Sequence, residues 1–474
     1  MPIRFRPLLS AISCAVLLTG VARAAPLPAP VDTSLSRIGI PPGAVTLLVQ
    51  DVDAPAPRVA HRNQDVLNPA SVMKLVTAYV ALERLGPAFT WTTRVSSKAG
   101  IRDQTLQGDL HVTGGGDPRL SRERLWLLLR DLRAQGIRRI AGDVITDRSY
   151  FQLPPHDPAA FDGRPLRPYN AGADALTIDY GAIRIRLVPG ADGVAAQVDP
   201  LPTGLDIDNR IRRSPESACT DPLAQLRATR MEGPERVRLT LDGTLPTGCR
   251  EPFDWNLSPL PPDRLFEGLF RRLWQELGGE IQGRFADGTT PPDAPTLAES
   301  RSPSLPEVLR DMNKWSNNVI ARHVLATLGA IDAPGQDSAS AGARTVQRTL
   351  LAKGITVDGM VVDNGAGLSR AERISASTLA QLLRAAWHGR TMPELVSSLP
   401  IAGIDGTARK RLADSPAAGT AHVKTGTLEG VRSLAGYVLA NSGHRYVVVL
   451  IINHPNAGAA REVQDALLEW VAGL

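Results

Sequence analysis

Residues 68–85, which read NPASVMKLVTAYVALERL, decide how the rest of the chain is interpreted. Apolar side chains recur there at helical spacing, which predicts a helix over residues 71–85 that ends at Gly86. Ser71 and Lys74 then lie one turn apart on the same face of that helix. A serine hydroxyl is a poor nucleophile without an adjacent base, and a lysine amine can be that base when burial lowers its pKa. The stretch therefore predicts a serine nucleophile activated by a lysine.

A second motif, Ser316-Asn317-Asn318, lies more than 240 residues further along the chain. The Ser316 hydroxyl could relay a proton between Lys74 and a leaving group. The Asn318 side chain carries a donor and an acceptor, which suits the binding of a substrate amide. Taken alone, the motif is equally typical of a helix cap or a loop.

The third motif, Lys424-Thr425-Gly426-Thr427, falls in a strand predicted over residues 421–427. A glycine within an edge strand lets a ligand backbone approach closely, so a peptide could bind there by strand addition. Lys424, Thr425 and Thr427 could hold a substrate carboxylate, and the Thr427 N–H could stabilise an oxyanion. The alternative is a lysine that only protects an exposed sheet edge.

The combination of the motifs carries more weight than any one of them. The chain has only six lysines, and two of them, Lys74 and Lys424, fall in the first and third motifs. A third lysine, Lys314, is close to the second motif. The three motifs occur in the order that serine acyl-transfer enzymes of the S-x-x-K, S-D-N and K-T-G type require.

With these motifs the chain resembles the class C low-molecular-mass penicillin-binding proteins, which are D-alanyl-D-alanine carboxypeptidases and endopeptidases of peptidase family S13. Further similar segments are GGGDP at 114–118, GDVITD at 142–147, DNGAGLSR at 363–370 and AGIDGT at 402–407. The middle motif differs slightly from the family pattern, since it reads Ser-Asn-Asn where Ser-Asp-Asn is frequent. No catalytic group is lost by this change.

The resemblance implies an α/β (α+β) multi-domain fold, with a penicillin-binding, β-lactamase-like domain in which helices flank an antiparallel sheet. Both chain ends are expected to build this domain, because strand and helix patterns occur at each end. The region between them has a different pattern, with many strands and Pro and Gly turns. We expect two nested insertions, the innermost rich in strands. The predicted boundaries are a catalytic domain at 25–88 and 296–474, a first inserted domain at 89–172 and 256–295, and a second at 173–255.

The resemblance also implies roles for the motif residues. Ser71 attacks the carbonyl between two D-alanines of a peptidoglycan stem peptide, Lys74 takes its proton, and Ser316 with Lys424 passes a proton to the leaving amine. Asn318 and the segment 424–427 bind the substrate and the oxyanion. β-Lactams are expected to acylate the same serine, and neither a cofactor nor a metal is expected.

Cleavage of cross-links requires a pocket for a diamino acid that carries an amine and a carboxylate. By position, Asp147 and Phe151 in the first insertion are candidates for this pocket, together with Arg370 and Glu429. A carboxylate and a guanidinium would suit such a zwitterion.

The first 24 residues have the features of a cleaved export signal: Arg4 and Arg6 precede a short apolar run that ends in Ala22-Arg23-Ala24. The run is shorter than a membrane span of about 20 residues, so cleavage is favoured over a retained anchor. We expect an exported, periplasmic protein, with peripheral binding to the inner membrane as a further option. Cys219 and Cys249 would then remain and form a disulfide, with two buried free thiols as the alternative.

Other classes of function fit less well. Aromatic residues make up 4% of the chain and its arginines are interspersed with acidic residues, which argues against nucleic-acid binding. A β-lactamase remains a rival, although no glutamate-containing deacylation motif follows Lys74 at the usual short spacing. A second rival is a non-hydrolytic wall-binding module that has kept the motifs.

Overall fold

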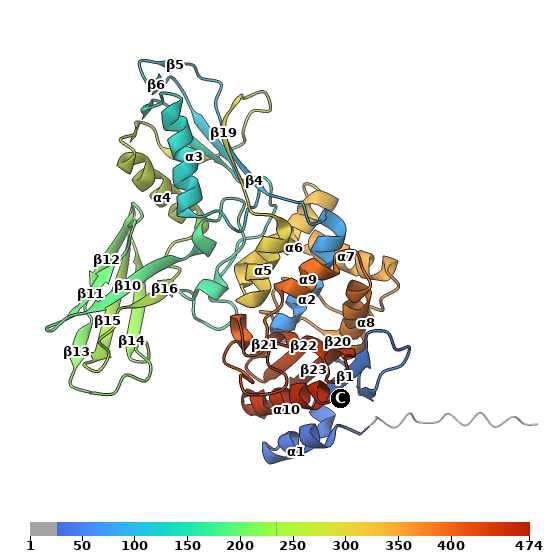
Figure 1. The fold of residues 1–474 in the computed structure, drawn as a ribbon. Helices are drawn as coiled ribbons and strands as arrows, with labels where there is room; N and C mark the ends of the chain where they lie inside the picture. Colours follow the sequence, from blue (N-terminus) through green and yellow to red (C-terminus); the bar gives the residue numbers. More distant parts are fainter. Residues whose placement is uncertain (1–25, 234) are drawn as a thin grey trace, which may run out of the picture.

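The structure is a computed structural model that describes residues 26–233 and 235–474 (Figure 1). The expected signal peptide, residues 1–24, lies outside the described residues. Within the two described ranges, no helix combines the length and the apolar character that crossing a membrane requires.

The two ends of the chain build one antiparallel five-stranded sheet, with the strand order β2-β1-β23-β22-β21. Its strands are short runs rich in β-branched residues, which favour extended backbone. The strand with the third motif lies at the sheet edge, as predicted from the sequence. The strands are β1 (Val45–Asp51), β2 (Val59–His61), β21 (Ala421–Leu428), β22 (Val431–Leu439) and β23 (Arg445–Asn453).

Helices cover both faces of this sheet (Figure 1). Alternate residues of β23 point to opposite faces, so Val448 and Leu450 join one core while Val449 and Ile451 join the other. The first core includes α1 (Ala29–Arg37) and α10 (Arg461–Ala472). The second includes α2 (Met73–Leu85), α5 (Leu305–Lys314), α6 (Asn318–Asp332), α7 (Ser338–Ala352), α8 (Ala376–Trp387) and α9 (Met392–Ser398). The expected sheet flanked by helices is thus confirmed.

The helix that carries Lys74 begins differently from the prediction. Ala70–Val72 form a 3-10 turn, and the α-helix starts at Met73 and ends before Gly86, whose φ is 78°. Residues 73–82 are all buried, which explains why the apolar pattern extends almost around this helix. A short ladder joins β3 (Val66–Leu67), just before the turn, to β20 (Ile374–Ser375).

The inserted region contains a second five-stranded sheet, in the order β18-β9-β7-β4-β19, with two amphipathic helices against it. The elements are β4 (Thr92–Ser96), β7 (Leu110–Thr113), β9 (Val144–Asp147), β18 (Phe285–Asp287), β19 (Thr296–Arg301), α3 (Arg122–Ala134) and α4 (Pro262–Glu276). A small sheet adds β5 (Ile101–Arg102), β6 (Thr105–Leu106), β8 (Arg139–Ile140) and β17 (Glu280–Ile281).

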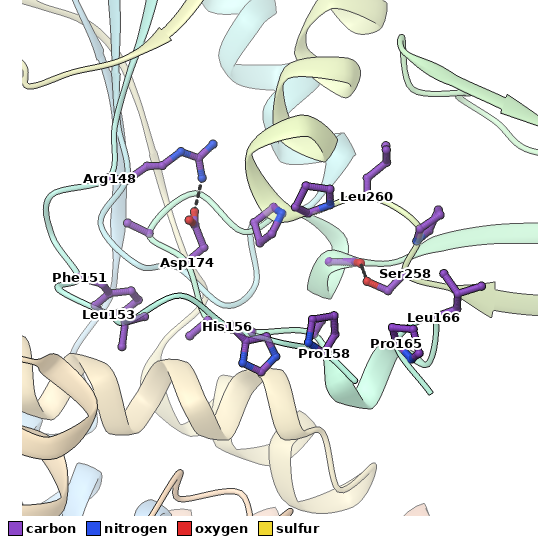
Figure 2. A pocket seen from close by; sticks show the side chains of 18 of the residues that line it. Arg148, Phe151, Leu153, His156, Pro158, Pro165, Leu166, Asp174, Ser258 and Leu260 are labelled. Carbon is purple, nitrogen blue, oxygen red and sulfur yellow. Dashed lines mark hydrogen bonds and ion pairs between the residues drawn. The ribbon is translucent and has the colours of Figure 1, made fainter. Parts of the chain in front are cut away.

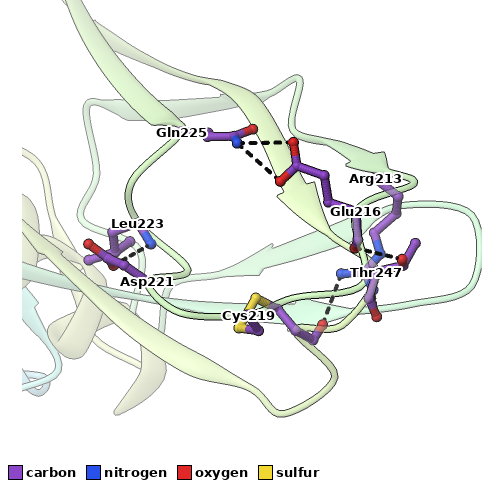
Figure 3. Close-up of a disulfide and its surroundings, with 8 residues drawn as sticks. Arg213, Glu216, Cys219, Asp221, Leu223, Gln225 and Thr247 are labelled. Atoms are coloured by element: carbon purple, nitrogen blue, oxygen red, sulfur yellow. Dashed lines mark hydrogen bonds between the residues drawn. A yellow bond between two sulfur atoms is a disulfide. The ribbon is translucent and has the colours of Figure 1, made fainter.

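The middle of the insertion is rich in strands, as expected, and extends away from the rest of the molecule (Figure 1). Cys219 and Cys249, 30 residues apart, form the expected disulfide there (Figure 3). The alternative of two free thiols is therefore wrong. The strands are β10 (Ile183–Pro189), β11 (Val194–Gln197), β12 (Leu205–Asn209), β13 (Arg212–Ser214), β14 (Leu226–Glu232), β15 (Val237–Pro246) and β16 (Phe253–Leu257).

The division of the insertion into two domains stays a prediction, and two observations bear on its boundaries. Strand β19 pairs with β4, so residues 296–301 belong to the inserted sheet. The predicted start of the second catalytic segment at residue 296 is therefore too early. Side chains of both inserted parts, such as Val95 and Leu239, belong to one continuous apolar core.

Residues 148–175 of the insertion contact helices α6 and α7 beside the central sheet. Gln152 N–H donates to Ser338 Oγ at 2.9 Å, and Asp174 N–H lies 3.4 Å from His323 Nε2 on α6. Asn318 Nδ2 donates to the Tyr169 carbonyl at 3.2 Å. The insertion therefore forms one wall beside the second motif.

Candidate active site

The backbone around Ser71 is held in an unusual conformation. Ala70 has a φ of 46°, a value that residues other than Gly, Asn and Asp rarely adopt. Gly367 lies against this turn so closely that a Cβ at 367 would lie 1.9 Å from the Ala70 carbonyl oxygen. The segment 363–370 and the strained turn thus fix each other and present Ser71, which stays partly exposed.

The Lys74 amine lies at the centre of the site and is fully buried. Its Nζ is 3.1 Å from Ser71 Oγ and 2.6 Å from Asn318 Oδ1. It also donates to the carbonyl of Ala366. The first and second motifs, separated by more than 240 residues in sequence, therefore meet at one nitrogen atom.

These contacts determine what a neutral Lys74 can do. A neutral amine has two N–H donors and one lone pair. The Ala366 carbonyl can only accept, and Asn318 presents its acceptor oxygen, so these two groups take both donors. The remaining lone pair is then directed toward Ser71 Oγ, where it can accept the hydroxyl proton.

A second lysine–serine pair lies beside the first. Lys424 Nζ donates to Ser316 Oγ at 2.9 Å and to the Thr425 carbonyl at 2.6 Å. Ser316 has a φ of 56°, so its hydroxyl is aimed by a strained backbone just before α6. The second and third motifs are therefore in direct contact.

Burial governs the protonation of both amines. Desolvation, with a smaller contribution from the charge on Lys424, holds the pKa of Lys74 well below its usual value of about 10.4. Desolvation also lowers the pKa of Lys424 to about 7. Lys74 is thus available as a neutral base, and Lys424 can exchange a proton near neutral pH.

The structure explains the glycine at position 426 by a contact within the protein, and not only by the approach of a ligand. A Cβ there would lie 2.2 Å from Ser433 Oγ and 2.6 Å from the Pro69 carbonyl oxygen. Ser433 Oγ itself donates to that carbonyl at 2.5 Å. Gly426 therefore lets the edge strand approach the turn that carries Ser71, besides leaving room for a ligand.

Both ends of the Asn318 amide are occupied within the protein. Its oxygen accepts from Lys74, and its Nδ2 donates to Tyr169 in the insertion. The second N–H of this Nδ2 can donate to a substrate carbonyl beside the Tyr169 carbonyl. The insertion therefore contributes directly to the substrate side of the site.

Glu372 shapes the site and was not singled out from the sequence. It is completely buried, and its Oε1 accepts N–H bonds from Asn364 at 3.2 Å and Gly365 at 3.0 Å. These bonds shape the loop whose Ala366 carbonyl holds Lys74. Its Oε2 has no hydrogen-bond partner among the described residues, and desolvation raises its pKa to about 7. Backbone N–H donors leave no side-chain pattern in a sequence, so no local signal pointed to this glutamate.

Two of the four expected pocket residues lie together. Arg370 Nη1 donates to the Glu429 carbonyl at 3.0 Å, and its Nη2 lies 3.4 Å from Glu429 Oε2. The Arg370 guanidinium also stacks over the ring of Phe161, 5.2 Å from its centroid. The Glu429 side chain is 92% exposed. Phe161 was not singled out from the sequence.

The other two expected residues are engaged elsewhere. Asp147 is 5% exposed, and its carboxylate accepts from Ser149 Oγ at 2.6 Å and from the Thr290 N–H at 2.7 Å. Phe151 packs edge-on against His323 and lines a separate cavity of about 470 Å³ (Figure 2). Neither side chain contacts Arg370 or Glu429 in the described part of the chain. The reason is tertiary, since hydrogen bonds and packing inside the insertion satisfy both side chains.

This fold is that of a penicillin-binding protein. The structure matches that of penicillin binding protein 4 (dacB) from Haemophilus influenzae with a TM-score of 0.76 and 24% sequence identity, over 94% of this chain and 99% of that one. A structure of the same protein complexed with a β-lactam gives a TM-score of 0.73.

Residues 29–474 match the D-Ala-D-Ala carboxypeptidase 3 (S13) family, and the chain belongs to this family. One relative is the D-alanyl-D-alanine carboxypeptidase of Actinomadura sp. strain R39, 31% identical over 427 residues, or 85% of this chain and 76% of the relative. Another is the D-alanyl-D-alanine carboxypeptidase DacB of Haemophilus influenzae, 27% identical over 82% of this chain and 81% of that protein.

Proposed function

We propose that the chain is a serine-type D-Ala-D-Ala carboxypeptidase with DD-endopeptidase activity on peptidoglycan stem peptides, and that it acts through an acyl-enzyme on Ser71. The position of Lys74 Nζ carries the proposal, because its two fixed acceptors direct its lone pair at Ser71 Oγ. Membership of the S13 family and the names of the relatives support the choice of substrate.

In the proposed acylation, neutral Lys74 takes the proton of Ser71 as Oγ attacks the carbonyl between the last two D-alanines. The N–H groups of Ser71 and Thr427 stabilise the oxyanion. Ser316 then delivers a proton to the leaving amine, and Lys424, with a pKa of about 7, restores that proton to Ser316. Water hydrolyses the ester in the second half-reaction.

Around this centre, Asn318 and the strand segment 424–427 bind the substrate backbone. The edge position of β21 supports strand addition by the stem peptide. Thr425 and Thr427 receive the carboxylate of the residue that leaves. β-Lactams acylate Ser71 in place of the peptide.

For the side chain of the diamino acid, Arg370 and Glu429 supply the guanidinium and the carboxylate that the zwitterion needs, and Phe161 holds the guanidinium. Arg370→Ala is expected to slow cleavage of cross-linked dimers about tenfold or more, the loss of a charge-assisted pair. Asp147→Ala is the matched control. We expect it to lower the free energy of unfolding and to leave the preference for cross-linked dimers unchanged. Equal loss of selectivity in both variants would restore Asp147 to the pocket.

The disulfide is of the kind that exported proteins carry. Because the substrate is cell-wall peptidoglycan, we place the protein in the periplasm, with peripheral contact to the inner membrane as an added proposal. Release of the protein by osmotic shock, compared with its retention on washed inner membranes, would test this location.

The test of the function uses stem-peptide monomers that end in D-Ala-D-Ala, cross-linked dimers, and a penicillin. We expect released D-alanine, resolved dimers and a penicillin adduct on Ser71, each identified by mass and each absent from Ser71→Ala. An acyl-enzyme with a lifetime of seconds or less would indicate a β-lactamase. Penicillin binding without turnover of any peptide would indicate a wall-binding module.

A further inference from the structure

A pocket of about 650 Å³ opens beside Ser71 and Ser316, on the side of the site where Thr425 and Thr427 lie. It is unusual in its charge. Of the described side chains that line it, none is acidic and five are cationic. We call it the cationic pocket, and its five cations are Arg409, Lys410, Arg411, Arg432 and Arg461.

Two of the five cations are engaged in holding the pocket together. Arg411 is 8% exposed and is bound to Asp465 at 2.5 Å and to Gln464 at 3.0 Å. Arg461 donates to the Lys410 carbonyl at 2.8 Å, and its Nε lies 3.7 Å from Asp465. One carboxylate therefore serves two guanidinium groups, and both act mainly as scaffold.

The other three cations have no acidic partner among the described residues. Arg409 and Lys410 are exposed. Arg432 is held only by neutral oxygens: it donates to Thr427 Oγ1 at 2.8 Å and to the Gly458 carbonyl at 2.6 Å. Like charges gathered in one pocket repel each other, so the pocket favours an anionic occupant.

Arg432 connects this charge to the reaction centre. It lies on β22 directly opposite Thr427 on β21, so the register of the central sheet fixes the guanidinium beside the third motif. Arg370 and Glu429 hold the diamino acid in the proposed function, which places them beside the stem peptide that acylates Ser71, here called the donor stem. Neither residue lines the cationic pocket. The pocket therefore lies on the leaving-group side.

We infer that the cationic pocket binds the leaving group and selects one with several carboxylates, namely the acceptor stem of a cross-linked dimer, over a single D-alanine. This inference rests on the proposed function. The one carboxylate of D-alanine can be satisfied by Arg432 with Thr425 and Thr427. Arg409 and Lys410 would then face no anion, and most of the volume would stay unfilled. An acceptor stem brings the carboxylates of its diamino acid and of its C-terminus, and it has the length to reach both cations.

The experiment compares two cross-linked dimers that share one donor stem. In one dimer the acceptor carboxylates are free, and in the other they are amidated except for the carboxylate next to the scissile bond. We expect kcat/KM to be at least about tenfold higher for the free acid, which corresponds to one charge-assisted contact. The preference is expected to shrink as salt is raised from 0.05 to about 0.5 M, since exposed charges are screened.

The double variant R409Q/K410Q is expected to lower this preference to about twofold or less. The matched control is R102Q/R390Q, which removes two exposed cations elsewhere on the chain. It changes the net charge by the same amount and is expected to keep the wild-type preference. A general effect of net charge would change both variants alike.

The outcomes are distinct. Equal rates on both dimers in the wild type, or an unchanged preference in R409Q/K410Q, would overturn the inference while leaving the enzyme's activity established. If the wild type cleaved neither dimer nor a D-Ala-D-Ala monomer, the proposed function would fail and the inference with it.

Discussion

In the part of the chain that the structure describes, a buried carboxylate of the insertion is ion-paired, whereas the two buried lysines around Ser71 are unpaired. In the insertion, Asp117 is 1% exposed and is bound by Arg124 at 2.5 Å. Around Ser71, by contrast, Lys74 and Lys424 are completely buried and neither forms an ion pair within the described residues. Desolvation that no ion pair offsets shifts the pKa of a group. Buried charge in the insertion therefore stabilises structure, and at the site it prepares proton transfer.

A lysine of the catalytic unit supports the same distinction. Lys314 is 4% exposed, close to the second motif, and its Nζ is bound to Asp405 at 2.6 Å and to the Leu399 carbonyl at 2.5 Å. It therefore fixes the loop around residue 405 and contributes no base. Proximity to a motif in sequence does not by itself make a lysine reactive.

The largest effect is expected from Lys74→Met, which keeps the apolar stem and removes the base. Acylation by a penicillin is expected to slow by a factor of about 10³ or more, within the range typical of general-base catalysis and orientation combined. Stopped-flow acylation and adduct mass measure it. A variant that acylates within tenfold of the wild type would show that Lys74 is not the base.

The next effect is in the insertion. The double variant C219S/C249S opens a loop of 30 residues and is expected to lose about 3–4 kcal/mol of unfolding free energy in the chain-entropy model. Penicillin acylation of the folded protein is expected to stay unchanged, because the disulfide lies in the strand-rich middle of the insertion, which extends away from the central sheet (Figure 1). Urea unfolding combined with acylation rates tests both parts. A comparable loss of acylation would contradict the separation of the two regions.

The third prediction concerns stability and pH. Lys424 has a pKa of about 7 when folded, against about 10.4 when unfolded, so between these values the unfolded chain binds a proton that the native chain lacks. Stability therefore rises with pH over this range, by up to about 1.4 kcal/mol per unit from this group. Lys424→Met is expected to reduce that slope in urea titrations at pH 7 to 9.5. An equal slope in both proteins would mean that Lys424 stays charged in the native state.

The smallest effect is expected from Glu372→Gln. The carboxylate of Glu372 raises the pKa of Lys74, so its neutralisation is expected to let Lys74 lose its proton at lower pH. The acid limb of the acylation rate profile should then move to lower pH. The buried amide donor is also expected to cost about 1–3 kcal/mol of stability. A thermal shift without movement of the pH profile would leave Glu372 with a structural role alone.

The local parts of this protein were readable from its sequence because they depend on short-range periodicity. The spacing of Ser71 and Lys74 on one turn, the helix that follows them and the strand that carries the third motif follow from such patterns. The edge position of the third motif was also predicted correctly. The disulfide followed from an even cysteine count in a chain expected to be exported.

The tertiary structure alone decided which side chains complete the site. The Ala366 carbonyl that orients Lys74, and the buried Glu372 that shapes its loop, act through backbone groups that are identical in every residue type. Likewise, only packing decided that Phe161 and not Phe151 contacts Arg370. Sequence patterns record which side chains can do chemistry, whereas the free energy of burial, set by contacts between distant segments, determines which of them do.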